Sequence, residues 1–183
     1  MKYYRIEQDD KVQHLPQMVN WFNVINEKYL HKGNYHMIAD RTMIYIKHDE
    51  QVVFPDAMIY PFHGFTEPIK KKIALYEPNM GFKTVFLVDK SNKNFQRYFI
   101  PFLSEYDCMH EQSITNLDKS KITKVVLDKA KIPYNKAIFL LGGVNTRCVI
   151  ARVDLVEGIL REDVYGLKLT RVEMKEDEHD RDR

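Results

Sequence analysis

The chain has 183 residues, of which 44% are hydrophobic and 12% aromatic, and it carries a formal net charge of +2. These values exclude an intrinsically disordered chain, and the length suits one domain with its own hydrophobic core. The small charge does not indicate a dedicated nucleic-acid-binding protein, because such proteins concentrate Lys and Arg on one face.

The sequence carries no signal for export or membrane insertion. The N-terminal segment MKYYRIEQDDK lacks an apolar stretch, and no apolar run approaches the ~20 residues that a membrane span requires. The two cysteines, Cys108 and Cys148, are far apart in the sequence, and a domain of this size needs no disulfide. We therefore expect a soluble, cytoplasmic protein with reduced, buried thiols.

The first fifty residues predict two strands separated by a segment of ambiguous pattern. Residues 2–7 and 42–47 are rich in aromatic and β-branched residues, which indicates strands. Apolar residues recur every three or four positions over residues 15–29, which predicts a helix. Several Asn and Val residues are poor helix formers, so an irregular loop anchored by Trp21 is the rival interpretation. Residues 1–52 are expected to form a less tightly integrated lobe.

The middle of the chain predicts an edge segment, a helix and a central hairpin. Pro55 follows residues 52–54 and Pro61 follows residues 57–60, which indicates an extended segment at a sheet edge or over the sheet. Thr66 is a good helix N-cap, and Pro78 ends the helix that follows it. Residues 82–103 contain two β-prone runs separated by a polar turn, which predicts a hairpin inside a covered sheet.

The last third predicts a second hairpin, a helix and a final strand. Strands are expected at residues 124–128, 137–141, 147–151 and 166–174, after an irregular stretch at 105–118. Gly142 and Gly143 supply the hairpin turn, because glycine adopts positive φ without steric cost. Asp154 is expected to cap a helix, with Glu157 in the capping-box position.

Together these elements predict an α+β fold, with a mostly antiparallel sheet and a few helices covering one face. We expect a single domain over residues 1–174. Residues 175–183 (KEDEHDRDR) contain five acidic and three basic residues and are expected to form a charged, disordered tail.

The densest group of reactive side chains comprises Asp107, Cys108, His110 and Glu111. A catalytic cysteine needs a base brought to it by the fold, so adjacency in sequence is little evidence, and a buried structural thiol is the favoured interpretation. A zinc site would need a second pair of ligands at suitable spacing, which the sequence lacks. We expect no metal and no cofactor. The seven histidines are interpreted as surface or cap-side residues.

Several segments resemble a family of bacterial immunity proteins from polymorphic-toxin and contact-dependent competition systems. The likeness covers residues 53–174, with weaker likeness at 17–21 and 41–47. The matching segments are VFPD, YEPNMGFKTVFLVDK, FIPFLSEYDC, KVVLDKAKI, AIFLLGGVNTRCVIARVDLVEGILRE and GLKLTRVEM. The resemblance implies a small cytoplasmic protein that binds and neutralises a cognate toxin, in some cases a nuclease, without catalysing a reaction.

Such a protein would occlude its toxin through an interface anchored by aromatic or Arg side chains. The candidates lie in three irregular segments and are Trp21, Tyr60, Tyr106, Asp107 and His110. Two alternatives remain open. One is a small hydrolase or transferase that uses Cys108 or its neighbouring Asp, His and Glu. The other is a nucleic-acid-binding module that uses the lysine-rich stretches at 70–72 and 119–136, which are otherwise interpreted as solvated surface.

Overall fold

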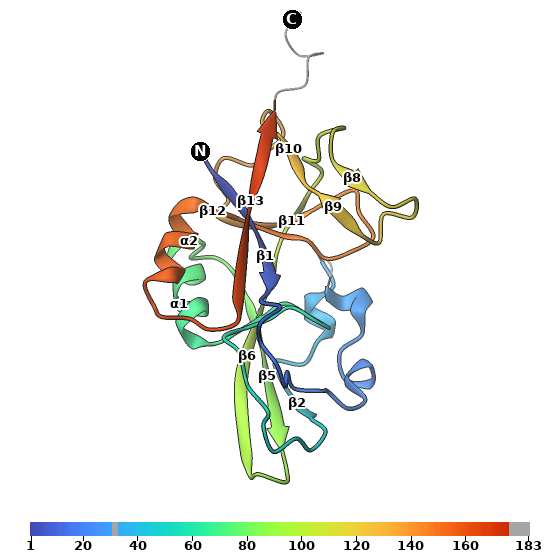
Figure 1. The fold of residues 1–183 in the computed structure, drawn as a ribbon, viewed down its shortest axis with the longest axis vertical. Coiled ribbons are helices and arrows are strands. Elements are labelled where there is room, and N and C mark those ends of the chain that lie inside the picture. The colour runs from blue at the N-terminus through green and yellow to red at the C-terminus, as the bar shows by residue number, and fades with distance from the viewer. Residues whose placement is uncertain (31–32, 176–183) are drawn as a thin grey trace, which may run out of the picture.

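The computed structural model describes residues 1–30 and 33–175. It shows the predicted α+β fold, with a six-stranded sheet, a five-stranded sheet and a two-stranded sheet. The two larger sheets occupy opposite ends of the molecule, and the two helices lie on one flank (Figure 1).

The six-stranded sheet has the order β10-β13-β1-β12-β11-β7. Its strands are β1 (Tyr3–Gln8), β7 (Glu105–Tyr106), β10 (Val126–Asp128), β11 (Ile138–Leu141), β12 (Val149–Arg152) and β13 (Leu167–Lys175). β1 lies in the interior of this sheet and pairs antiparallel with both β12 and β13. The predicted hairpin of β11 and β12 is confirmed.

The five-stranded sheet has the order β2-β5-β6-β4-β3. Its strands are β2 (Arg41–Tyr45), β3 (Ala57–Met58), β4 (Gly64–Phe65), β5 (Phe82–Asp89) and β6 (Asn94–Pro101). β5 and β6 form the predicted hairpin, and β3 lies at the edge where the flanking prolines place it. The small third sheet pairs β8 (Ile114–Thr115) with β9 (Ile122–Lys124).

The two larger sheets are mixed, which corrects the expectation of one mostly antiparallel sheet. Parallel pairing joins β2 with β5, β10 with β13, and β7 with β11. In each case a long connection separates the paired strands, so the chain can return to the same end of the sheet before it pairs. Local sequence patterns report strands but not such long-range pairing.

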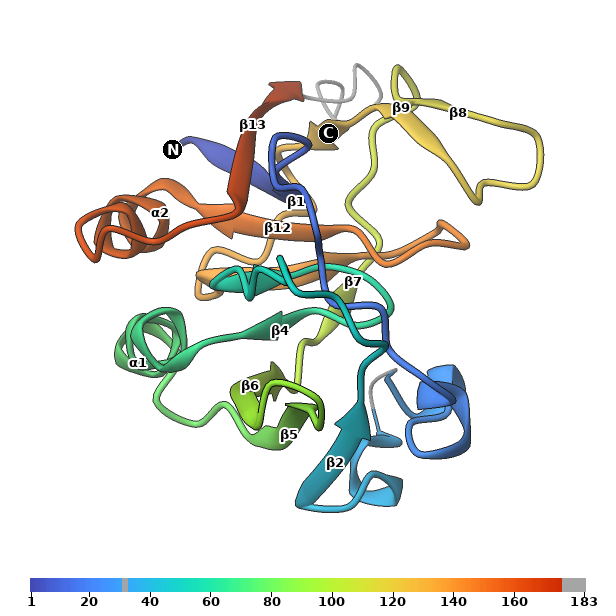
Figure 2. The same ribbon diagram turned by 60° about the horizontal axis from the view of Figure 1, so that its bottom comes forward.

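The two helices are α1 (Glu67–Tyr76) and α2 (Val153–Leu160). They contact each other, while α1 packs on β4 and β6 and α2 packs on β1 and β12. Figure 2 shows them side by side, one next to each large sheet. The helices therefore connect two sheets instead of covering one face of a single sheet. Ile69, Ile73, Leu155 and Ile159 are fully buried in this shared core.

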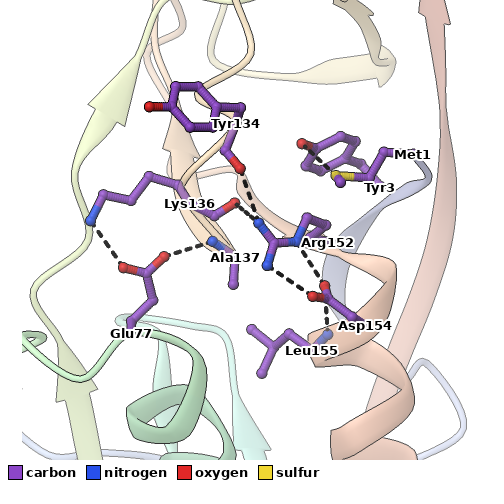
Figure 3. A network of polar contacts seen from close by, with 9 residues as sticks. All are labelled: Met1, Tyr3, Glu77, Tyr134, Lys136, Ala137, Arg152, Asp154 and Leu155. Carbon is purple, nitrogen blue, oxygen red and sulfur yellow. Dashed lines mark hydrogen bonds and ion pairs between the residues drawn. The ribbon is translucent and has the colours of Figure 1, made fainter.

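Thr66 occupies the N-cap position of α1, as predicted, but its side chain does not cap the helix. The Asp154 side chain accepts a hydrogen bond from Leu155 N at 3.0 Å, as expected of a residue that caps Leu155, but Asp154 is not the N-cap residue. The hydroxyl of Thr66 donates to Asp56 Oδ1 at 2.5 Å and makes no hydrogen bond to the helix. Asp154 lies in the first turn of α2, and Arg152 precedes the helix. Arg152 binds Asp154 through Nε–Oδ1 and Nη2–Oδ2, both at 2.8 Å (Figure 3). This hydrogen bonding lowers the pKa of the Asp154 carboxyl.

The helix predicted over residues 15–29 is wrong. The chain instead forms short 3₁₀ turns at Trp21–Asn23, Glu27–Leu30 and Tyr35–Met37. Asn20 adopts a left-handed conformation, with φ of 51°, and Asn26 accepts a hydrogen bond from the Lys28 backbone N–H. Asn favours such local conformations over a continuing helix, so the rival irregular loop around Trp21 is the better description.

These turns pack on the five-stranded sheet through Ile25, Leu30, Tyr35 and Ile38, which are all buried. At the other end of the chain, Lys175 belongs to β13, while residues 176–183 of the expected tail lie outside the described residues. Within the described residues, neither helix has the length and apolar character needed to cross a membrane.

Candidate functional site

Three aromatic side chains from two distant segments meet on the surface. Trp21 contacts Phe22 and Tyr60 edge-on, with ring centroids 6.2 and 6.3 Å apart. Phe22 is 60% exposed and Tyr60 is 74% exposed, whereas Trp21 is half-buried. We call Trp21, Phe22 and Tyr60 the aromatic cluster. The structure thus brings together two of the predicted partner-binding residues.

Anchored neighbours hold the aromatic cluster in place. Val19 N donates to Tyr45 O at 2.8 Å, which ties the start of the first turn to β2. Phe62, close behind Tyr60, is fully buried among the residues that cover the five-stranded sheet. The exposed rings therefore project from backbone that is hydrogen-bonded to β2 on one side and followed by the buried Phe62 on the other.

A cavity of about 530 Å³ adjoins the aromatic cluster through Tyr60. Its lining comes from five parts of the chain: β1, the second 3₁₀ turn, residues 59–63, β7 and the β11–β12 hairpin. The lining residues are Arg5, Glu27, Ile59, Tyr60, Pro61, His63, Glu105, Leu140, Leu141, Val144, Asn145, Thr146 and Arg147. The cavity thus lies where both ends of the molecule contribute residues. A volume of this size is in the range typical of small-molecule sites, roughly 300–1,000 Å³.

The predicted glycine turn shapes one wall of this cavity. Gly143 has φ of +73°, and a Cβ on Gly142 would lie 3.0 Å from the backbone N of Asp107. Gly142 N donates to Tyr106 O at 2.7 Å. Glycine is therefore required for the hairpin to lie directly against β7 and to present Val144, Asn145 and Thr146 to the cavity.

Two cavity residues have buried polar atoms without a hydrogen-bond partner. His63 is 2% exposed, and neither of its ring nitrogens is hydrogen-bonded. Arg147 donates from Nη1 to Leu30 O, but its Nε and Nη2 have no partner. Burial, together with the charges of Arg147 and Arg5, lowers the pKa of His63 to about 3, so its ring is neutral at physiological pH.

The other predicted partner-binding residues do not join the aromatic cluster. Tyr106 is half-buried and packs edge-on against Phe139, with ring centroids 5.8 Å apart. His110 is buried and its Nδ1 accepts a hydrogen bond from Gln112 N at 3.1 Å. Asp107 is exposed beside the glycine turn. His110 is therefore buried, which corrects its place among the interface candidates, whereas Tyr106 and Asp107 stay predictions away from the aromatic cluster.

The interpretation of all seven histidines as surface residues is wrong for His63 and His110, which are buried. In sequence, His63 follows Pro61 and Phe62 in a segment without regular alternation, so no periodicity reports its burial. Arg147 likewise begins a predicted strand, and nothing in that pattern marks it as a cavity residue. No local pattern indicates that His63 and Arg147 share a cavity, because they lie 84 positions apart in the sequence.

The group formed by Asp107, Cys108, His110 and Glu111 does not provide the environment that a cysteine nucleophile needs. Cys108 and Cys148 are both free and buried, as expected. Burial, with a smaller contribution from Asp107, raises the pKa of Cys108 to about 12, and burial raises the pKa of Cys148 to about 11. Both thiols are therefore protonated at neutral pH, whereas a nucleophilic cysteine needs its thiolate. Among the described residues, no group of three His, Cys, Asp or Glu side chains is placed to hold a metal ion.

We expect both thiols to react slowly with Ellman's reagent in the native protein at pH 8. The physical reason is burial, which denies access and keeps the thiols protonated. The measurement compares the reaction rate of the native protein with that of the protein in about 6 M guanidinium chloride, a concentration above the unfolding midpoint of most domains. A native Cys108 that reacts as fast as the unfolded control would revive the enzyme alternative.

The lysine-rich stretches are largely neutralised within the chain. Five of these lysines form ion pairs with carboxylates, namely Lys70–Glu67, Lys72–Glu162, Lys124–Glu173, Lys131–Asp128 and Lys136–Glu77. A cation paired with a carboxylate gains less from contacting a phosphate, because the existing pair must first be broken. The solvated-surface interpretation therefore remains the better one.

No protein-family model matches the sequence, and a comparison with curated proteins gave no match. Function is therefore inferred from the geometry of the aromatic cluster and cavity, together with the resemblance described above.

Proposed function

We propose that this chain is a non-catalytic immunity protein that binds a cognate bacterial toxin and neutralises it by occlusion. The observation that carries the proposal is the aromatic cluster, an exposed and anchored group of rings next to a cavity. Tyr, Trp and Phe are enriched in protein interfaces, where they supply large contact area at small entropic cost. The cytoplasmic location and the toxin partner follow from the sequence resemblance.

The surroundings of the aromatic cluster suit a protein interface. Val19 and Val24 beside it are also exposed, and the nearby Glu27 adds a charged edge. An apolar centre with a polar rim is the usual anatomy of an interface. A stable interface covers about 800 Å² per partner, so the contact would extend beyond the aromatic cluster over the neighbouring turns. That the toxin is a nuclease is proposed on the resemblance alone.

The enzyme alternative has weaker support. It depends on Cys108 or on the Asp107, His110 and Glu111 side chains around it. Cys108 is buried and protonated, while the Nδ1 of His110 already accepts a backbone hydrogen bond. A base engaged in this way is poorly placed to activate a nucleophile. Binding through the aromatic cluster is therefore the favoured function.

Replacing Tyr60 or Trp21 by alanine is expected to weaken toxin binding by at least ~2 kcal/mol, about thirtyfold, because each substitution removes a ring from the proposed anchor. The toxin is the product of the neighbouring reading frame, co-expressed with the tagged protein, and affinity is measured by calorimetry. Tyr134→Ala is the matched control, since Tyr134 is 85% exposed and lies outside the aromatic cluster.

The Tyr134 variant is expected to bind like the wild type. The Tyr60 and Tyr134 variants are expected to keep wild-type unfolding midpoints, whereas Trp21→Ala is expected to stay folded with a lowered midpoint, because Trp21 is half-buried and packs on the core around the five-stranded sheet. Full binding by both Tyr60→Ala and Trp21→Ala would place the interface elsewhere. A neighbouring gene product that is harmless when expressed alone would count against the immunity function itself.

A further inference from the structure

The cavity beside Tyr60 concentrates the unpaired polar groups of the protein. Among the described residues, five buried side-chain atoms lack a hydrogen-bond partner, and they are Thr42 Oγ1, both ring nitrogens of His63, and Nε and Nη2 of Arg147. Four of the five thus belong to two residues that line one cavity. Burying such groups without partners is unfavourable. The cavity is therefore the place in the described chain where a ligand would relieve the most unpaired polar atoms.

The unpaired edge of Arg147 has the geometry for a carboxylate. Nε and Nη2 form one side of the guanidinium, and their two N–H bonds point in parallel. Arg152 shows the same edge in use, because its Nε and Nη2 bind the two oxygens of Asp154, each at 2.8 Å (Figure 3). Meanwhile Nη1 of Arg147 donates to Leu30 O and fixes the orientation of the group. Arg147 is therefore a preorganised, unoccupied fork.

The charges around the cavity favour a single negative charge on the ligand. Arg5, the other cation of the lining, already donates to Ile122 O at 3.2 Å and pairs with Glu7 at 3.5 Å. Glu27 and Glu105 add carboxylates to the lining. His63 is neutral, so it contributes one N–H donor and one acceptor but no charge. A phosphate dianion would meet these carboxylates with only one uncommitted cation to balance it.

We propose that this cavity binds an organic carboxylate, whose two oxygens accept from Nε and Nη2 of Arg147 while His63 hydrogen-bonds an adjacent polar group of the ligand. The carboxylate is carried either by a free small acid or by an Asp or Glu side chain of a bound protein. The first source is independent of the proposed toxin binding. The second would make the cavity part of the same interface, because Tyr60 belongs to both.

The test titrates the protein with named probes while the Arg147 Nε–H and His63 ring resonances are followed by NMR. Sodium acetate is compared with acetamide, its neutral analogue of the same shape, and with inorganic phosphate at matched ionic strength. A second arm uses the tripeptide Ac-Ala-Glu-Ala-NH2, whose only carboxylate is the side chain, against Ac-Ala-Gln-Ala-NH2. Saturable shifts with acetate or with the Glu peptide, but not with the neutral analogues, are expected.

Arg147→Gln is expected to weaken carboxylate binding at least tenfold, and Arg147→Lys nearly as much, because lysine keeps the charge but lacks the fork. Arg97→Gln is the matched control, since Arg97 is an exposed arginine outside the cavity lining. Unfolding midpoints verify that each variant is folded, and the wild-type titration needs no variant at all.

The two titrations distinguish the sources of the carboxylate. Shifts with acetate indicate a free small acid, and shifts with the Glu peptide indicate an acidic side chain of a bound protein. The proposal fails if no carboxylate shifts the Arg147 and His63 resonances, which would mean that the cavity holds water alone. It also fails if phosphate binds as tightly as acetate, or if Arg147→Gln binds like the wild type. Toxin binding is measured separately, so either proposal can fail while the other stands.

Discussion

Replacing Phe139 by alanine is expected to lower the free energy of unfolding by about 3–5 kcal/mol, the usual cost of deleting a buried aromatic ring. Phe139 is fully buried in β11, which lies between β12 and the edge strand β7 of the six-stranded sheet. Its ring contacts Tyr3 and Tyr106 edge-on, at centroid distances of 6.1 and 5.8 Å. The substitution would therefore remove the middle ring of three and leave a cavity that the paired strands cannot close.

Urea denaturation measures this effect, with the midpoint and the slope recorded for each variant. Phe95→Ala is the control because Phe95 is 60% exposed on β6, and a change of about 0.5 kcal/mol or less is expected there. Equal loss in both variants would show that the packing around Phe139 is not the source of the stability.

Replacing Glu77 by alanine is expected to destabilise the protein by about 3 kcal/mol. The buried carboxylate of Glu77 accepts hydrogen bonds from Ala137 N at 2.6 Å and from Lys136 Nζ at 2.9 Å (Figure 3). These bonds join the C-terminal end of α1 to the residue that precedes β11. Without the carboxylate, a buried backbone N–H loses its partner, and that loss dominates because Lys136 can turn to solvent.

Thermal and urea unfolding of three variants separate these contributions. Glu77→Gln keeps an oxygen for Ala137 N–H and is expected to lose about half as much stability as Glu77→Ala. Glu67→Ala removes a carboxylate from the same helix, but its ion pairs with Lys70 and Arg97 lie near the surface, so a loss under about 1 kcal/mol is expected. A Glu77→Ala protein as stable as Glu67→Ala would contradict the role assigned to the buried bond.

The sequence was most informative where structure depends on near neighbours. The β5–β6 hairpin, the helix after Thr66 and the β11–β12 hairpin with its glycine turn all follow from local patterns of apolar residues and turn residues. The helix expected over residues 15–29 failed because correct spacing of apolar residues competed with several Asn residues, which favour local turns. The parallel pairing of β2 with β5 joins segments 41–45 and 82–89, and no local signal encodes it.

The same distinction explains what could be predicted of the site. Trp21 and Tyr60 were singled out as aromatic residues in irregular segments, which is a local property. His63 and Arg147 matter because the fold brings them to one cavity, and their importance lies in hydrogen bonds that they do not make within the chain. Unsatisfied buried groups can be recognised only after every other partner has been placed. Conversely, His110 is a polar residue in an irregular segment, and only the packed fold shows that it is buried.

The position of β1 sets an order of events during synthesis. Tyr3 is aligned with Arg152 on one side and with Val172 on the other, so both neighbours of this first strand are made last. A ribosome that adds roughly 5–20 residues per second needs roughly 7–28 s for the ~140 residues that separate β1 from β12. The five-stranded sheet uses only residues 41–101 and has all its strands well before then. During those seconds β1, with Tyr3 and Tyr4, has neither of its partner strands and is accessible to chaperones. All five strands of the other large sheet have by then been synthesised.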